Sequence, residues 1–314
     1  MTIHGRAAGI AVAIHLSCAV LAHAQPWVPA RGEGAVSFNY QTYDVAGHFD
    51  VHGNRNNNGG TYSQSLLAEI QFGITDRLAL TVGVPFVASK YTGPPEYRVG
   101  GFLTVPGPLD DGTYHGTFQD FRIEMRRAWW IRRVAVAPLA AFVIPTHHYE
   151  THGEAVAGRD RREAQIGASA GIDLAPFLPH TLVSCRYALA SAERQHGFSS
   201  VRSNIDLDGE YAVTRLVSAR GLGSWQVAHK GPTIPELEAD DWLGHDRFIV
   251  STYFDAGAGV SLALRRNVDV NAVWMRTVSG SRGAHAARML SVGVTVGFGS
   301  TSDGFSIFTP SSDH

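Results

Sequence analysis

The residues with the clearest capacity for chemistry are charged side chains that recur at alternate positions. One set lies between positions 120 and 126, and another lies between positions 202 and 210. The first set is Asp120, Arg122, Glu124 and Arg126, and the second is Arg202, Asp206, Asp208 and Glu210. Alternate residues of a β-strand point to the same face, so each set would place opposite charges along one surface. Four further charges stand within apolar alternating segments: Glu69, Arg186, Asp255 and Asp269.

Two interpretations of these charges stay open. They could form a ladder of ion pairs that stiffens or partly closes a passage, or they could line an aqueous pore and select solutes by charge. Both interpretations place the same side chains on an inner, wet surface, because charge facing lipid costs about 2–4 kcal/mol at mid-depth for Arg.

A short histidine-rich segment is the candidate metal site. It contains His147, His148, Glu150, His152 and Glu154. Imidazole and carboxylate groups at close spacing bind zinc or copper, and His48 and His52 could add ligands if two loops meet. The alternative is a hydrophilic external loop in a chain with 15 histidines. Nothing else in the sequence indicates a cofactor.

The sequence offers little support for covalent catalysis. Gly167-Ala168-Ser169-Ala170-Gly171 matches the G-x-S-x-G pattern of hydrolases, but that serine needs a strand-to-helix elbow. Here the pattern lies inside an alternating segment, where small residues on a lumen face explain it. A lipid hydrolase would need a serine and a histidine together on the outer wall, and no His-x-Ser pair occupies adjacent outward positions. We therefore predict that the protein is not an enzyme.

The segments that carry the charges alternate between apolar and polar residues. The clearest runs are 66–74, 78–86 and 290–298, and a period of two indicates strands. Several runs reach about 12 residues, whereas strands of soluble domains have about 5–6. Charge in mid-strand is costly in a sandwich core and expected in a wet lumen. The prediction is an all-β protein, a transmembrane antiparallel β-barrel.

Short and long connections alternate along the chain, as in outer-membrane barrels. Counting them gives about 12 strands, and 10 or 14 would also fit the length. The connection Thr92–Gly116 is long enough to fold into the barrel mouth as a constriction. The alternative is a loop that stays outside the barrel.

Aromatic residues favour two belts at the membrane surfaces. Those predicted near the short turns are Trp129, Trp130, Phe177 and Tyr211, and those predicted near the long loops are Phe86, Tyr91, Trp225 and Phe248.

Composition excludes several other classes. Charged residues make up 17% of the chain and Gly accounts for 34 of 314 residues. No interior stretch stays apolar for about 18 residues, which argues against a helical membrane protein. A formal net charge of -2 argues against nucleic acid as a partner. Two cysteines are too few for a disulfide framework.

Three regions are expected along the chain. Residues 1–24, with Arg6, an apolar run and Ala22-His23-Ala24, match a cleaved secretory signal peptide. Residues 25–299 form the barrel, and residues 300–314 form a polar tail. The expected location is the outer membrane of a Gram-negative cell. The expected partners are outer-membrane lipid and lipopolysaccharide, the barrel-assembly machinery and a small-molecule solute.

Three segments of the chain carry a family resemblance: residues 25–34, then Gly73-Ile74-Thr75-Asp76-Arg77-Leu78-Ala79-Leu80, and then Val84-Pro85-Phe86. They resemble a family of outer-membrane transporter-like barrels named for the meta-pathway of phenol degradation. The resemblance implies a monomeric barrel that moves small, apolar or aromatic molecules across the outer membrane, and it carries over no catalytic residues. The rival is a structural or interaction barrel whose lumen is closed by its own charged side chains. A barrel lipid hydrolase is the third hypothesis.

Overall fold

A computed structural model describes residues 26–299, except for residues 58, 94–96, 100–102, 106, 176 and 233–244. The predicted signal peptide and polar tail lie outside the described residues. None of the described helices is long and apolar enough to cross a membrane.

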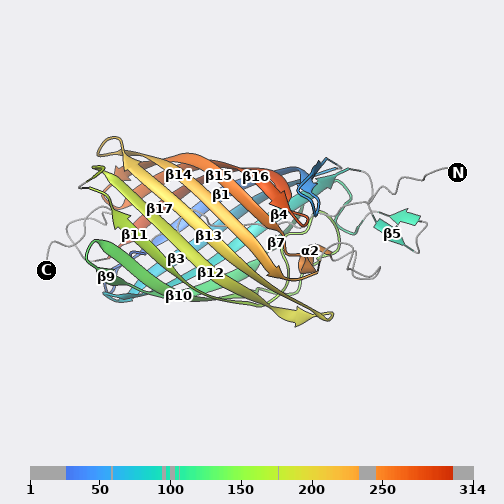
Figure 1. The fold of residues 1–314 in the computed structure, drawn as a ribbon, viewed down its shortest axis with the longest axis horizontal. Coiled ribbons are helices and arrows are strands. Elements are labelled where there is room, and N and C mark those ends of the chain that lie inside the picture. The colour runs from blue at the N-terminus through green and yellow to red at the C-terminus, as the bar shows by residue number, and fades with distance from the viewer. Residues whose placement is uncertain are drawn as a thin grey trace.

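Twelve long antiparallel strands form a closed barrel in the described part of the chain (Figure 1). They are β1 (Gly34–Phe49), β3 (Gly60–Thr75), β4 (Leu78–Thr92), β8 (Asp120–Arg127), β10 (Val134–Pro145), β11 (Glu163–Asp173), β12 (Thr181–Gln195), β13 (Phe198–Ala212), β14 (Val217–Lys230), β15 (Thr252–Arg265), β16 (Val268–Ser281) and β17 (His285–Phe298). This confirms the predicted fold class and strand number.

The barrel closes because its first and last strands pair. Gly34 of β1 is opposite Phe298 of β17, and the ladder continues to the pair formed by Val45 and Ala287. Every other long strand pairs with its neighbours in sequence order. Closure leaves none of the described long strands with an unpaired edge, which is what a spanning sheet requires in lipid.

Several short elements complete the wall and its mouth. β7 (His115–Phe118) pairs with β4, β9 (Trp129–Ile131) pairs with β10, and β2 (Arg55–Asn56) pairs with β1. β5 (Tyr97–Val99) and β6 (Leu103–Val105) form a separate hairpin. The helix α2 (His245–Phe248) is one turn long.

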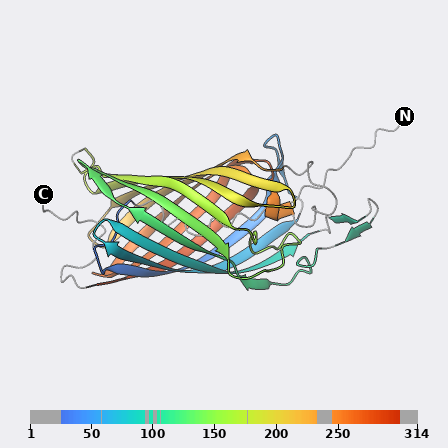
Figure 2. The same cartoon turned by 90° about the horizontal axis from the view of Figure 1, so that it is seen from below.

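The two ends of the barrel differ in their connections (Figure 2). Tight turns such as Thr75–Leu78 gather at one end, where the Thr75 hydroxyl accepts the backbone N–H groups of Arg77 and Leu78. Longer segments, including residues 146–162 and the described residues 245–251, gather at the other end. In outer-membrane barrels short turns are periplasmic and long loops external, and we name the two ends accordingly.

Side chains alternate between the two faces of the wall as predicted. On β3 the outward Leu66 and Ile70 are 48% and 43% exposed, whereas the inward Ser65 and Glu69 are 3% and 8% exposed. Large apolar side chains therefore cover the surface that would contact lipid, and polar side chains line the lumen.

The aromatic belts are only partly correct. Five of the eight residues are exposed on the outside: Phe86, Trp129, Phe177, Tyr211 and Trp225. Trp130 is also exposed, but it pairs with Ala135 and so lies on the lumen side of the wall. Tyr91 and Phe248 are instead buried inside the mouth, at 3% and 2% exposure. The alternation that puts Val87 on the lumen face does the same for Tyr91, and Phe248 belongs to α2 rather than to a strand.

Candidate functional site

The structure places all the predicted lumen residues on the inward face of the wall. They are Glu69 on β3; Asp120, Arg122, Glu124 and Arg126 on β8; Arg186 on β12; Arg202, Asp206, Asp208 and Glu210 on β13; Asp255 on β15; and Asp269 on β16. Their role in selecting solutes stays a prediction.

Glu124 is the centre of the largest group of ion pairs. Its carboxylate accepts a hydrogen bond from Arg122, and its Oε1 lies 3.3 Å from Arg126 Nε. Arg186 Nη2, which comes from β12, donates to Glu124 Oε2 at 3.2 Å. Glu124 is 1% exposed, so three arginines surround one buried carboxylate. The group links β8 to β12 across the two strands between them.

Small residues make this crossing feasible. The lumen faces of β10, β11 and β12 carry alanines and a serine that are at most 1% exposed: Ala135, Ala137, Ala141, Ser169, Ala188 and Ala190. Long charged side chains can lie over such short ones. Ser169, the serine of the G-x-S-x-G pattern, is therefore a lumen-wall residue within β11, as the sequence indicated.

The charge network continues along β13. Arg186 Nη1 lies 3.6 Å from Asp206 Oδ2, and Asp206 also accepts a hydrogen bond from Ser224 Oγ at 2.9 Å. Asp208 forms a two-point ion pair with Arg220.

Two members of the network, Glu163 and Arg220, were not predicted. Glu163 accepts hydrogen bonds from Arg202 at both carboxylate oxygens, at 2.5 Å and 3.0 Å. Arg220 is the partner of Asp208. Both stand at alternate positions, Glu163 with Gln165 on β11 and Arg220 with Ser218 on β14. Extending the period-two pattern to single charges would have found them.

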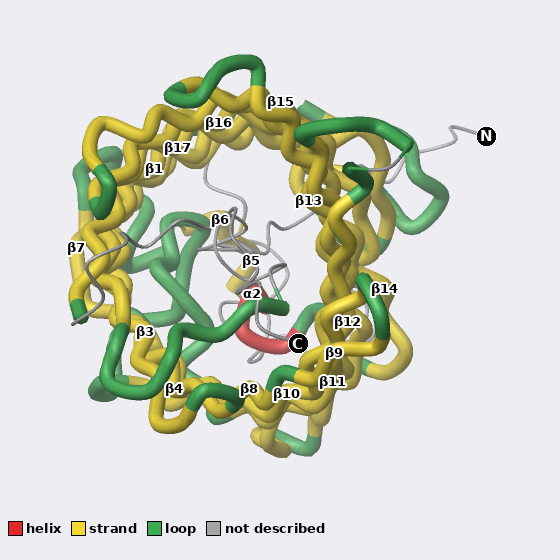
Figure 3. Tube along the Cα trace, turned by 90° about the vertical axis from the view of Figure 1, so that its left-hand side faces the viewer, coloured by secondary structure: helices red, strands yellow, loops and turns green. Residues whose placement is uncertain are grey.

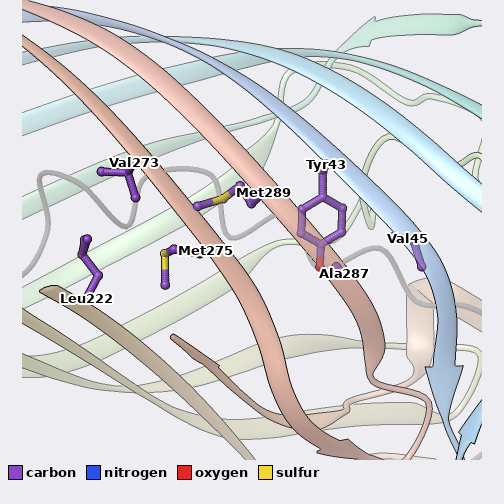
Figure 4. Close-up of a cluster of buried hydrophobic side chains, with 7 residues drawn as sticks. All are labelled: Tyr43, Val45, Leu222, Val273, Met275, Ala287 and Met289. Carbon is purple, nitrogen blue, oxygen red and sulfur yellow. The ribbon is translucent and has the colours of Figure 1, made fainter. Parts of the chain in front are cut away.

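An apolar sector of the lumen wall lies on β1, β14, β16 and β17 (Figure 4). It comprises Tyr43, Val45, Leu222, Val273, Met275, Ala287 and Met289, from β1, β14, β16 and β17. Gly257 and Gly259 of β15 adjoin it, and a Cβ on them would collide with Met275 and Val273 respectively. The two glycines therefore leave room for these side chains, and the lumen lining combines an apolar sector with charged groups.

Two segments fold into the external mouth, and we call them together the external plug: residues 146–162 and residues 245–251. Looking along the barrel, α2 and loop segments lie within the ring of strands (Figure 3). Ala155 and Val156, each 1% exposed, pack with Leu109 and Tyr91. Ile249 and Val250 are fully buried.

Hydrogen bonds fix the plug to inward-facing wall residues. Thr61 Oγ1 of β3 donates to Glu154 O at 3.1 Å, and Gln226 Nε2 of β14 donates to Ser251 O at 2.8 Å. Asp110 Oδ1 accepts the backbone N–H groups of Glu154 and Ala155. The connection 92–116 therefore contributes to the closure through Leu109 and Asp110, but the described part of the closure is built mainly by the plug.

Arginines join the two plug segments. Arg161 donates to the backbone carbonyls of Arg247, Glu193 and Phe198. Arg247 Nη2 in turn donates to Asp160 O at 2.9 Å, and Arg159 Nη2 donates to Ile249 O at 3.0 Å. Each bond ties residues 159–161 to the segment around α2 or to the rim of the wall.

Burial lowers the pKa of Arg161 to about 10, with the nearby charge of Arg247 acting in the same direction. Burial, followed by the charge of Arg202, lowers the pKa of Arg159 to about 9. Both guanidinium groups thus stay protonated at neutral pH. Burial and the neighbouring Asp120 raise the pKa of Tyr149, whose hydroxyl donates to Asp120 Oδ1 at 2.5 Å.

Residues 26–33, which precede β1, form a separate segment at the periplasmic end. Gly32 N donates to Gly73 O and Gly73 N donates to Glu33 O, both at 2.9 Å, which attaches the segment to β3. Further back, Pro26 and Trp27 pack against Gly171 of β11, where an added Cβ would lie 2.8 Å from Pro26 Cγ. Residues 26–33 therefore reach from β3 to the lumen face of β11.

The predicted metal ligands each have a different partner. His147 Nε2 contacts Thr117 Oγ1 at 3.0 Å, His148 Nδ1 contacts Asp160, and His152 Nδ1 contacts Glu150. Among the described residues there is no group of three or more His, Cys, Asp or Glu side chains arranged to hold a metal ion. Metal binding by this segment stays a prediction.

A serine and a histidine from different strands meet on the outer wall. Ser203 Oγ lies 2.7 Å from His229 Nε2 and 3.0 Å from the Tyr187 hydroxyl, on the outward face of β12–β14. The residues stand on different strands, so no His-x-Ser spacing reveals them. A catalytic triad needs a third group that orients the histidine, and the hydrogen bonds described for His229 include none. Ser203 itself is 6% exposed.

Comparison with known proteins supports the fold. No family model matches the sequence, and no curated protein matches it. An outer-membrane channel from Pseudomonas putida F1 is similar, with a TM-score of 0.64 and 12% identity over 87% of this chain and 98% of that chain. The NanC porin (TM-score 0.47, 8% identity, 83% and 98% covered) and the CymD monoaromatic hydrocarbon channel (0.43, 9%, 87% and 90%) are more distant.

At these identities the likeness shows the fold alone. Together with the closed wall and its apolar outer face, it defines a transmembrane β-barrel of the outer-membrane type, in agreement with the predicted location.

Proposed function

We propose that the protein is an outer-membrane channel for small molecules that carry an apolar or aromatic group. The observation that carries this proposal is the mixed lining of the lumen, in which Leu222, Met275 and Met289 form part of an apolar sector while Glu124 and its arginines form a charged one. An apolar group would pass along the first sector, and water or a polar substituent would pass along the second. The resemblance of residues 73–86 to the phenol meta-pathway barrels points to the same class of solute.

Current recordings with added solutes test this proposal. Phenol, at concentrations that leave the bilayer intact, should produce brief interruptions of the single-channel current, and glycerol should produce none. The variant Met275→Gln/Met289→Gln should shorten the phenol events, because it removes apolar surface from the lumen. The control variant is Gln41→Asn, which lies inside the lumen beside Met289 and leaves the apolar side chains of the sector in place. Leu290→Gln cannot serve as the control, because Leu290 faces outward. Equal effects of phenol and glycerol would remove the support for an apolar solute.

A second candidate is a structural or interaction barrel that passes no solute. It is favoured by the ion pairs around Glu124 inside the lumen and by the external plug inside the mouth. This candidate predicts a folded barrel that never conducts, even when the plug is loosened. A lipid hydrolase has weaker support, since the pair formed by Ser203 and His229 has no described orienting group.

A further inference from the structure

Buried histidines lie where the external plug meets the wall. His48 at the end of β1 and His285 at the start of β17 are opposite each other in the strand register, and they are 0% and 4% exposed. None of their four ring nitrogens has a hydrogen-bond partner among the described residues. Buried polar side chains almost always have one, so this pair calls for an explanation.

A third histidine connects the pair to the plug. His245, the first residue of α2, is fully buried and close enough to interact electrostatically with both His48 and His285. Its Nε2 lies 3.9 Å from Glu154 Oε1 in the other plug segment. The cluster therefore joins two wall strands to both segments of the plug.

Few other charges face the pair in the described part of the chain. Glu154 belongs to residues 146–162, and Asp50 follows β1 close to His48. Asp50 is exposed, and one of its carboxylate oxygens accepts the backbone N–H groups of His52 and Asn54. The Tyr43 ring is centred 6.3 Å from that of His285. His245 with Glu154 can form an ion pair, but among the described residues no hydrogen-bond acceptor is placed at the ring nitrogens of His48 or His285.

This arrangement tolerates only neutral imidazole at the wall. A charged group buried without a partner is strongly destabilised, and two adjacent imidazolium groups would also repel each other. His245, when protonated beside Glu154, adds a third positive charge. Moving α2 and residues 146–162 away from the wall would expose the rings to water and relieve the repulsion.

We propose that His48, His245 and His285 form a proton-sensitive latch that holds the external plug against the wall at neutral pH and releases it in acid. The proposal rests on the geometry of the plug and is independent of which solute, if any, the barrel passes.

Hydrogen–deuterium exchange of the full barrel in detergent tests the latch. Rates are compared at pH 7.5 and pH 4.5 after correction for the intrinsic pH dependence of exchange. Peptides covering residues 146–162 and 245–251 should lose at least tenfold protection in acid, while peptides from mid-barrel strands keep theirs. Unchanged protection of both plug peptides in the wild-type barrel would overturn the proposal without need of any variant.

Two variants test whether the acid-induced loss of protection comes from the buried histidines. His48→Gln/His285→Gln removes the titrating pair and should abolish the acid-induced loss of protection. His52→Gln, which removes an exposed imidazole four residues from His48, should behave as wild type. An acid response that persists in the double variant, or that disappears in His52→Gln, would overturn the assignment to the latch.

Conductance separates this proposal from the proposed function. A barrel that loses plug protection in acid yet passes no current at either pH would support the latch proposal and contradict the channel function. A barrel that conducts equally at pH 7.5 and pH 4.5, with unchanged plug protection, would support the channel function and contradict the latch proposal.

Discussion

At the scale of single residues, Glu124 is the buried lumen carboxylate around which the largest described group of ion pairs forms. Its carboxylate is fully buried and is the common partner of Arg122, Arg126 and Arg186. Removing one member of a buried ion-paired group costs about 3–5 kcal/mol, because it leaves uncompensated charge behind. The stability of the barrel should therefore depend on this carboxylate far more than on any surface charge.

The variant Glu124→Gln should lower the free energy of unfolding by about 3–5 kcal/mol, measured as the denaturant midpoint of the heat-modifiable band on a gel. Asp44→Asn, on the outward face of β1, is the matched control and should change it by less than about 1 kcal/mol. Equal midpoints for Glu124→Gln and wild type would show that the arginines find other acceptors.

The alternating charges illustrate what the sequence can and cannot predict. Period-two spacing was enough to assign Asp120, Arg122, Glu124 and Arg126 to one inward face. It could not predict that Arg186 of β12 pairs with Glu124, because that contact depends on the small side chains of the intervening strands. It also missed Glu163 and Arg220, which are isolated charges in their strands.

At the scale of elements, the external plug is the part of the described fold that sequence patterns did not predict. The connection 92–116 was the candidate constriction because of its length, whereas residues 146–162 and 245–251 form most of the described closure. Neither segment alternates, so no periodic signal marks it as buried. Contacts with other elements bury it, such as those with Thr61, Leu109 and Gln226.

Arg161 is the contact on which the plug depends most. Its guanidinium group donates to three backbone carbonyls, and hydrogen bonds to charged groups contribute about 1.5–3 kcal/mol each. Arg161→Ala should therefore loosen both plug segments and raise the single-channel conductance at neutral pH. Arg55→Ala, in an exposed position of the first external loop, should leave the conductance at the wild-type value. A conductance of Arg161→Ala equal to wild type would mean that the plug does not limit the current.

At the scale of the whole molecule, the lumen carries more negative than positive side chains. In the described strands the inward residues include ten carboxylates: Glu69, Asp120, Glu124, Glu163, Asp173, Asp206, Asp208, Glu210, Asp255 and Asp269. The five inward arginines of these described strands are Arg122, Arg126, Arg186, Arg202 and Arg220. An acidic lining favours cations.

The barrel should therefore prefer K⁺ over Cl⁻, with a reversal potential of the corresponding sign in a KCl gradient. Asp255 and Asp269 have no arginine partner among the described ion pairs, so Asp255→Asn/Asp269→Asn should reduce the preference without breaking a pair. A preference for Cl⁻ in the wild-type barrel would contradict this account of the lumen.

The architecture of the whole barrel was more predictable than its plug. Period-two alternation, long runs and the alternation of short and long connections recur along the whole barrel region, so they predicted about 12 antiparallel strands. The closure depends on single contacts between distant segments, as with Phe248, which was expected on the outer surface and lies inside the mouth.

Single-channel recording in a planar bilayer tests the central claim most directly, using wild type and Arg161→Ala with folding verified by a shift between unheated and heated gels. The account predicts discrete steps in both proteins, with larger steps in Arg161→Ala. A folded Arg161→Ala barrel that passes no current would contradict the channel and leave the structural barrel as the function.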